Sequence, residues 1–130
     1  MPNWCDNEWV IYAKSVEQAK EIADLFTNDD KGFKHYDPIT FTKLIPLPEG
    51  GWNCDWCCKN WGTKWDASQG SIDVSGEKVT MRFYTAWSPP GGVVRVFDEK
   101  YPDVSRTFIY REDGMQLAGY WLFIYKKIER

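Results

Sequence analysis

Histidine is nearly absent from this sequence and occurs once, at His35. The motifs His-Glu-x-x-His, Gly-x-x-x-x-Gly-Lys-Ser/Thr and Gly-x-Ser-x-Gly are missing as well. They would have indicated a zinc peptidase, a phosphate-binding loop and a serine hydrolase, respectively. The sequence therefore lacks the motifs of these three kinds of site, and no complete catalytic set replaces them.

Long apolar runs are also absent. No segment approaches the roughly 20 consecutive apolar residues that a membrane-spanning helix needs. The first six residues, MPNWCD, hold neither the basic nor the apolar region of a secretory signal. We therefore expect a cytoplasmic protein with no membrane partner, in which the cysteines remain thiols.

An excess of positive charge is absent too. Sixteen Lys and Arg residues stand against nineteen Asp and Glu residues, which gives a net charge of −3. Neutralising the phosphates of duplex DNA requires a basic surface, so a general duplex-DNA-binding function is disfavoured. What is abundant is aromatic residues, at 17% of the chain, including eight tryptophans. A chain of 130 residues can form a single domain, 1–130, that folds without a disulfide or a metal.

Hydrophobic periodicity predicts a chain of mostly β-strands with two helices. Apolar residues alternate in the strands and recur every three or four residues in the helices. The predicted strands are 4–13, 39–47, 72–74, 78–87, 104–111 and 115–125; the helices are 16–27 and a second one from Ser88 to before Pro102; and 49–70 is a long connection rich in Gly, Trp and Cys.

Two positions mark where the helices begin. Ser15 followed by Gln18 forms a capping box, which satisfies free backbone amides at a helix start. Ser88 followed by Pro89 is typical of an N-cap with proline at the first helical position. In the strand before it, alternation places Trp87 on the same buried face as the apolar residues that precede it.

These elements favour one mostly antiparallel sheet with two helices on a single face. The hairpins require antiparallel neighbours, and the order of elements fits the ferredoxin-like split β-α-β arrangement, an α+β fold, with residues 49–70 as an inserted loop. Such a sheet has exposed edge strands, so a homodimer through a strand edge is one assembly open to it.

Four blocks of residues carry a resemblance to a known family. They are PNWCDN at 2–7, WCCKNWGTKWDA at 56–67, TAWSPP at 85–90, and Glu112-Asp113-Gly114 followed by Gly119. Together they span nearly the whole chain and resemble the YubB-like or Api-like family, small proteins of phages and conjugative plasmids with a ferredoxin-like domain. The resemblance implies that fold and a mobile-element origin in a bacterial host. It implies no established reaction.

The long connection is the strongest candidate for a binding site. It concentrates tryptophans, which supply much contact area at small entropic cost, beside charged side chains that can select a partner. The alternative is structural, with the tryptophans anchoring an irregular loop to the sheet. The candidate site consists of Asn60, Trp61, Thr63, Lys64, Trp65 and Asp66 from the connection, supported by Trp4, Asn7 and Trp87 from neighbouring strands.

The cysteines allow two further interpretations. Cys54 and Cys57 are spaced as in zinc-binding and thioredoxin-like motifs, and Cys5, Cys58 and His35 are the other candidate ligands. A zinc site needs a second close pair, which is missing. A redox site needs a preceding strand and a following helix, which the flanking residues do not provide. We therefore expect plain thiols, with no metal and no cofactor.

Three functions follow, in order of preference. The first is a non-enzymatic accessory protein of a phage or plasmid that binds a host or host-defence protein through the Trp/Cys loop and the adjoining sheet edge. The second is a binder of a small ligand or single-stranded nucleic acid on the open sheet face. The third is an enzyme that uses Cys57, Lys64 and Asp66. The aromatic and basic side chains assigned to the open face are Arg82, Tyr84, Arg106, Tyr110, Arg111 and Tyr120.

Overall fold

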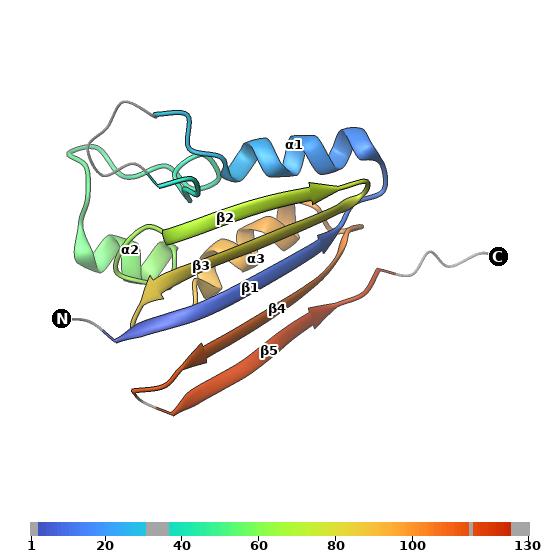
Figure 1. Cartoon of the computed structure of the whole chain (residues 1–130). Helices are drawn as coiled ribbons and strands as arrows, with labels where there is room; N and C mark the ends of the chain where they lie inside the picture. Colours follow the sequence, from blue (N-terminus) through green and yellow to red (C-terminus); the bar gives the residue numbers. More distant parts are fainter. Residues whose placement is uncertain (1–2, 31–36, 115, 126–130) are drawn as a thin grey trace.

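A computed structural model describes residues 3–30, 37–114 and 116–125 and contains one five-stranded sheet and three helices in these ranges (Figure 1). No helix in these ranges is long and apolar enough to cross a membrane. In chain order the elements are β1 (Trp4–Tyr12), α1 (Val16–Phe26), α2 (Cys54–Asn60), β2 (Ser68–Ser75), β3 (Lys78–Ala86), α3 (Gly91–Lys100), β4 (Ser105–Glu112) and β5 (Leu117–Phe123).

The sheet has the order β2-β3-β1-β4-β5, and every neighbouring pair is antiparallel. The connection from β1 to β2 contains α1 and α2, and β3 lies between these two strands in the sheet. The connection from β3 to β4 contains α3, and β1 lies between those two strands. This is the split β-α-β arrangement. The predicted ferredoxin-like α+β fold is therefore confirmed, and β5 extends it by one strand beside β4.

The helices cover one face of the sheet, and the core lies between the two layers. Trp9 in β1 is fully buried at its centre. Its ring packs edge-on against Phe26 of α1, Phe97 of α3 and Phe108 of β4, with centroids 5.1, 5.2 and 5.5 Å away. Contacts of this geometry add to the free energy gained by burying apolar area. They also show that α1 and α3 lie on the same face.

At the start of α1, Ser15 caps the helix as predicted, and the Gln18 side chain bonds the amide one residue before the cap. The Gln18 backbone amide donates to Ser15 Oγ over 3.0 Å, and the Gln18 side chain accepts from the Lys14 amide over 2.8 Å. Two backbone amides at the helix start are thereby satisfied. Val16, expected on the inner stripe, is exposed, so the buried stripe of α1 begins at Ala19.

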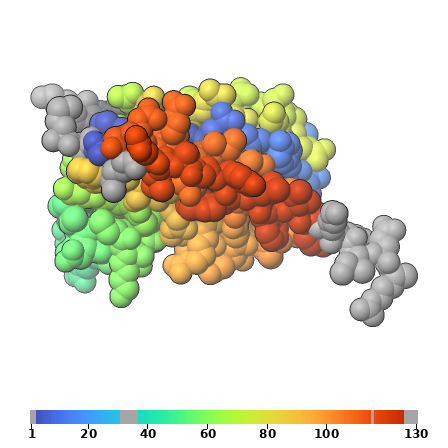
Figure 2. Space-filling view, turned by 90° about the horizontal axis from the view of Figure 1, so that it is seen from below, coloured from blue at the N-terminus to red at the C-terminus, as the bar shows by residue number. Residues whose placement is uncertain are grey.

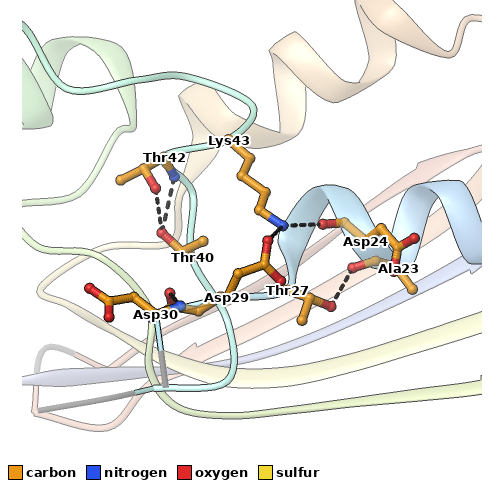
Figure 3. Close-up of polar contacts among 9 residues, drawn as sticks. Ala23, Asp24, Thr27, Asp29, Asp30, Thr40, Thr42 and Lys43 are labelled. Carbon is orange, nitrogen blue, oxygen red and sulfur yellow. Dashed lines mark hydrogen bonds and ion pairs between the residues drawn. The ribbon is translucent and has the colours of Figure 1, made fainter. Parts of the chain in front are cut away.

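The predicted strand 39–47 is wrong. Only Ile39 forms a β-bridge, to Thr27, and the chain then turns. Figure 3 shows Lys43 reaching back to the end of α1, where its Nζ lies 2.9 Å from the Asp24 carbonyl oxygen and 2.6 Å from Asp29. The alternation of residue types was real, but no neighbouring strand is available to pair with this segment, so polar contacts fix it instead.

The connection 49–70 is more regular than predicted. It contains α2, whose N-cap Asn53 accepts a 3.0 Å hydrogen bond from the Trp56 amide. The last residues of the connection, from Ser68 on, belong to β2. A helix of seven residues spans two turns, which is too short to produce a clear hydrophobic period in the sequence.

The end of β3 also differs from the prediction. Trp87 lies outside the strand, its φ of 71° turns the chain, and its side chain is 44% exposed instead of buried. Ser88 does not cap α3, which begins at Gly91 after Pro90. Instead Ser88 Oγ donates over 2.6 Å to the Gly62 carbonyl and so holds the residues after α2.

Candidate binding surface

An exposed aromatic cluster forms where the start of β1 meets the residues that follow α2. Trp4 is 39% exposed on the face of the sheet away from the helices. The half-buried Trp65 lies against it, with ring centroids 6.1 Å apart, and Lys64 Nζ lies 5.0 Å from the Trp65 ring. That distance is within the range of a cation–π contact. With Tyr84, which is exposed on β3, these residues form what we call the aromatic surface.

A small hollow lies within the aromatic surface. It is lined by Trp4, Ser68, Gln69 and Tyr84 and has a volume of about 80 Å³. Pockets for small ligands occupy roughly 300–1,000 Å³, so this hollow is too small to enclose one. It suits a single protruding side chain or ordered water, which favours a contact surface over a ligand pocket.

The backbone under the hollow is irregular. The pairing of β2 with β3 shifts register between Ser68 and Ser71, and Gln69 within this bulge has a φ of 52°. Left-handed backbone is costly for residues other than glycine, and bulges re-aim side chains at sheet edges. The bulge therefore brings Gln69 to the rim of the hollow, beside Trp4 and Tyr84.

Trp61 is buried in the core instead of exposed for contact, which corrects the prediction. It is 1% exposed, packs edge-on against Phe41 and Trp56, and donates its Nε1 proton to the Ile45 carbonyl over 3.1 Å. Thr63 is equally buried and donates to a backbone carbonyl of β3 over 2.8 Å. Both residues anchor the segment after α2 to the core.

Asn7 and Asn60 are structural as well. Asn7 is fully buried, and its Nδ2 donates over 3.0 Å to Thr85 Oγ1 and over 3.3 Å to the Phe83 carbonyl. Its role is to link β1 to β3 on the helix side of the sheet. Asn60 is half-buried, and its Nδ2 donates over 2.9 Å to the Trp56 carbonyl at the end of α2.

Asp66 links residues 40–41 to the segment that follows α2 by hydrogen bonds. It accepts hydrogen bonds from Thr40 Oγ1 at 2.7 Å and from the Phe41 and Ala67 amides at 2.8 Å. Burial raises the pKa of this carboxyl, and the three hydrogen bonds oppose that rise. Its oxygens are occupied by this chain, so Asp66 supports Trp65 rather than contacting a partner itself.

The four cysteines are free thiols. Cys5 and Cys57 are buried, and burial raises the pKa of Cys5 to about 11 and also raises that of Cys57. A thiol with a raised pKa is protonated at neutral pH and is a poor nucleophile. The nearby Asp66 raises the Cys57 pKa further, so Cys57, Lys64 and Asp66 do not form an activated set.

The described part of the chain contains no group of three or more His, Cys, Asp and Glu side chains arranged to hold a metal ion. Cys54 is half-buried and Cys58 is exposed, both on α2, whereas Cys5 lies on β1. His35, the other candidate ligand, lies outside the described residues.

The open face of the sheet carries fewer basic side chains than predicted. Arg106 points to the helix side instead, where it is buried and paired with Asp98 at 2.6 Å. Tyr110, also expected on the open face, packs with Trp121 at 5.0 Å against the core. Of the expected residues, Arg82, Tyr84, Arg111 and Tyr120 lie on the open face.

Two residues of this region, Trp52 and Gln69, are missing from the predicted site. Trp52 is exposed, and its Nε1 donates over 2.9 Å to the Lys64 carbonyl, which fixes the backbone beside the aromatic surface. Gln69 reaches the rim of the hollow through the bulge, a feature with no sequence signal here. Tyr84 was predicted on the open face beside Arg82, but it was not included in the candidate site.

The fold defines a class: ferredoxin-like domains extended by a fifth strand, here with exposed aromatic side chains at one end of the sheet. Residues 60–129 match the family model of the ferredoxin-like domain in Api92-like protein, which covers more than half of the chain. The chain belongs to this Api92-like family. The match begins at the end of α2 and includes Lys64, Trp65 and Tyr84. Comparisons with curated proteins and with solved structures gave no match.

Proposed function

We propose that this chain is a non-enzymatic accessory protein that binds another protein through the aromatic surface. The proposal places it in a phage or conjugative plasmid, acting in the cytoplasm of the bacterial host on a host or host-defence protein. The observation that carries it is the exposure of Trp4 and Tyr84 beside the Trp65–Lys64 pair. Tryptophan, tyrosine and a rim of charge are typical of the energetic centre of protein interfaces.

The electrostatics of the open face support a protein partner over a nucleic acid. Arg82 pairs with Glu8 at 2.8 Å, and Arg111 pairs with Asp113 at 3.3 Å. A phosphate would have to displace a carboxylate from each arginine, and the net charge of −3 opposes its approach. A face with both signs of charge is better matched by another folded protein.

The alternative, a small-ligand binder, rests on a broad depression of about 720 Å³ over β4 and β5. Its volume is adequate for a ligand. Ile109, Ala118, Tyr120 and Leu122 line much of it, which makes it apolar and offers few polar groups to orient a small molecule. This arrangement also suits a protein contact better than a ligand.

The test is affinity capture from the bacterial host with three folded baits. They are the wild type, the double variant Trp4→Ala/Tyr84→Ala, and the control Tyr12→Ala, which removes an exposed tyrosine from the other end of β1 on the same face. We expect one protein to be captured by the wild type and the control and lost with the double variant. With that protein purified, the double variant should bind at least about tenfold more weakly. Equal capture by all three baits would place the interface elsewhere and reject the proposal.

A further inference from the structure

Strand β5 is an unprotected edge of the sheet. Among the described residues its only neighbouring strand is β4, and Figure 2 shows β5 along the side of the molecule that faces the viewer. From Leu117 to Tyr125 the sequence has no charged residue and no proline. Natural proteins usually blunt free edges with charges, prolines, bulges or covering segments, because an exposed row of backbone donors and acceptors pairs readily with another strand.

The other edge of the same sheet is protected. Strand β2 carries the register shift between Ser68 and Ser71, which interrupts regular pairing, and it presents Asp73 on the open face. A bulge and a charge are two of the usual devices that prevent edge-to-edge association. The contrast within one sheet indicates that the bare edge of β5 has an occupant.

We propose that β5 pairs antiparallel with β5 of a second copy of this chain, about a two-fold axis at Tyr120, which joins the two sheets into one. Each copy then covers the free backbone groups of the other.

The proposed register determines which side chains of the two β5 strands lie opposite one another. Pairing about Tyr120 sets Leu122 opposite Ala118 and Trp121 opposite Gly119. The first pair lies on the open face, in line with Thr107 of β4, and the second on the helix side. On the open face, Leu122 therefore meets the small Ala118, and Tyr120 meets its own copy across the axis. On the helix side, the Tyr110 side chain already lies over Gly119.

Charge also favours a second copy at this edge. In a two-fold interface every residue on the axis faces its own copy, so a charge there would repel itself. Tyr120, which is 71% exposed, is neutral, and so are its neighbours in the strand. Two copies that each carry a net charge of −3 repel one another least where the local charge is zero.

The small area of the proposed interface indicates a modest affinity between the two copies. Stable interfaces bury about 1,600 Å² in total, and one seven-residue strand pair with its exposed apolar side chains is smaller. We therefore expect a dissociation constant in the micromolar range rather than an obligate dimer. This dimer is independent of the proposed aromatic surface, which lies at the start of β1.

The test is sedimentation equilibrium of the full chain from about 1 μM to about 1 mM. We expect the wild type to form a concentration-dependent dimer. The variants Tyr120→Lys and Tyr120→Glu should each dimerise at least about tenfold more weakly, because like charges meet on the axis. An equimolar mixture of the two variants should recover the dimer, because opposite charges then meet. The control Tyr12→Lys, at an exposed site on β1, should dimerise like the wild type.

Three results would overturn the proposal. They are a monomeric wild type over the whole range, a Tyr120→Lys variant that dimerises like the wild type, and a mixture of the two charge variants that stays monomeric. Unchanged thermal unfolding of both variants would show that they are folded, and the exposure of Tyr120 predicts this result.

Discussion

The carbonyl oxygen of Asn60 occupies the place where a Cβ on residue 92 would lie, so that only glycine fits at Gly92. The end of α2 and the start of α3 touch backbone to backbone here. The Gly92 amide donates to the Trp61 carbonyl over 3.1 Å. Through this contact α3 positions the residues that follow α2, and with them Lys64 and Trp65 of the aromatic surface.

Gly92→Ala is expected to destabilise the protein strongly. The added methyl group would overlap backbone atoms of Asn60 and Trp61, which cannot rotate away as a side chain can. We expect a loss of about 3 kcal/mol in the free energy of unfolding, measured by urea denaturation. The matched control is Gly91→Ala, whose new methyl group would lie 3.5 Å from the Trp121 ring in ordinary contact. Equal stability of the two variants would contradict this view of the α2–α3 junction.

Truncation to alanine is expected to lower the free energy of unfolding strongly at Trp61 and very little at Trp87. Trp61→Ala empties a site in the core and should cost about 3–5 kcal/mol of unfolding free energy. Trp87→Ala removes an exposed side chain and should change stability by about 0.5 kcal/mol or less. Urea denaturation of the two variants measures both values. Comparable losses would mean that Trp87 is packed in the folded protein.

Asp66→Ala is expected to loosen the tie between residues 40–41 and 66–67. The Phe41 and Ala67 amides would lose their acceptor, at a cost of about 3 kcal/mol in unfolding free energy. Asp66→Asn keeps one oxygen for these amides and should cost about 1 kcal/mol. Denaturation curves of the two variants provide the comparison. If Asp66→Ala were as stable as the wild type, these hydrogen bonds would contribute little to stability. Asp66 would then again be a candidate contact residue.

The stability of the fold is expected to fall at alkaline pH because of Cys5. Its folded pKa of about 11 exceeds the ordinary value of 9.0. Below pH 9 the thiol is neutral in both states and its burial is fully stabilising. Between 9 and 11 only the unfolded chain ionises, so the contribution is lost as pH rises. Near pH 10.5 we expect a loss of about 2 kcal/mol relative to Cys5→Ser, whose hydroxyl does not titrate. Parallel pH profiles of the two proteins would contradict this assignment.

The main frame of the fold was predictable because burial repeats with period two. In β1 and β3 alternate residues are buried, and the pattern alone places Trp9 and Phe83 inward. The same rule failed at residues 39–47, where alternation is present but a neighbouring strand is not. Periodicity reports which face a segment would bury, and it does not report whether another strand lies within hydrogen-bonding distance.

The candidate site was predictable only in part. The sequence identified the aromatic side chains of the region, and the structure brings Trp4, Lys64 and Trp65 together. It did not separate buried Trp61 from exposed Trp87, because that difference depends on where β3 ends and the backbone turns left-handed. Glycine usually indicates such a turn in a sequence, but the residue at this turn is tryptophan.

Trp87 has a left-handed backbone conformation that favours glycine, and it also carries an exposed indole side chain. Glycine adopts this conformation without the strain that a tryptophan bears, which is on the order of 1 kcal/mol. A screen that selects variants for heat resistance alone would therefore favour Trp87→Gly and discard an exposed indole in the process. Selection for heat resistance would consequently alter the exposed surface of this protein at Trp87.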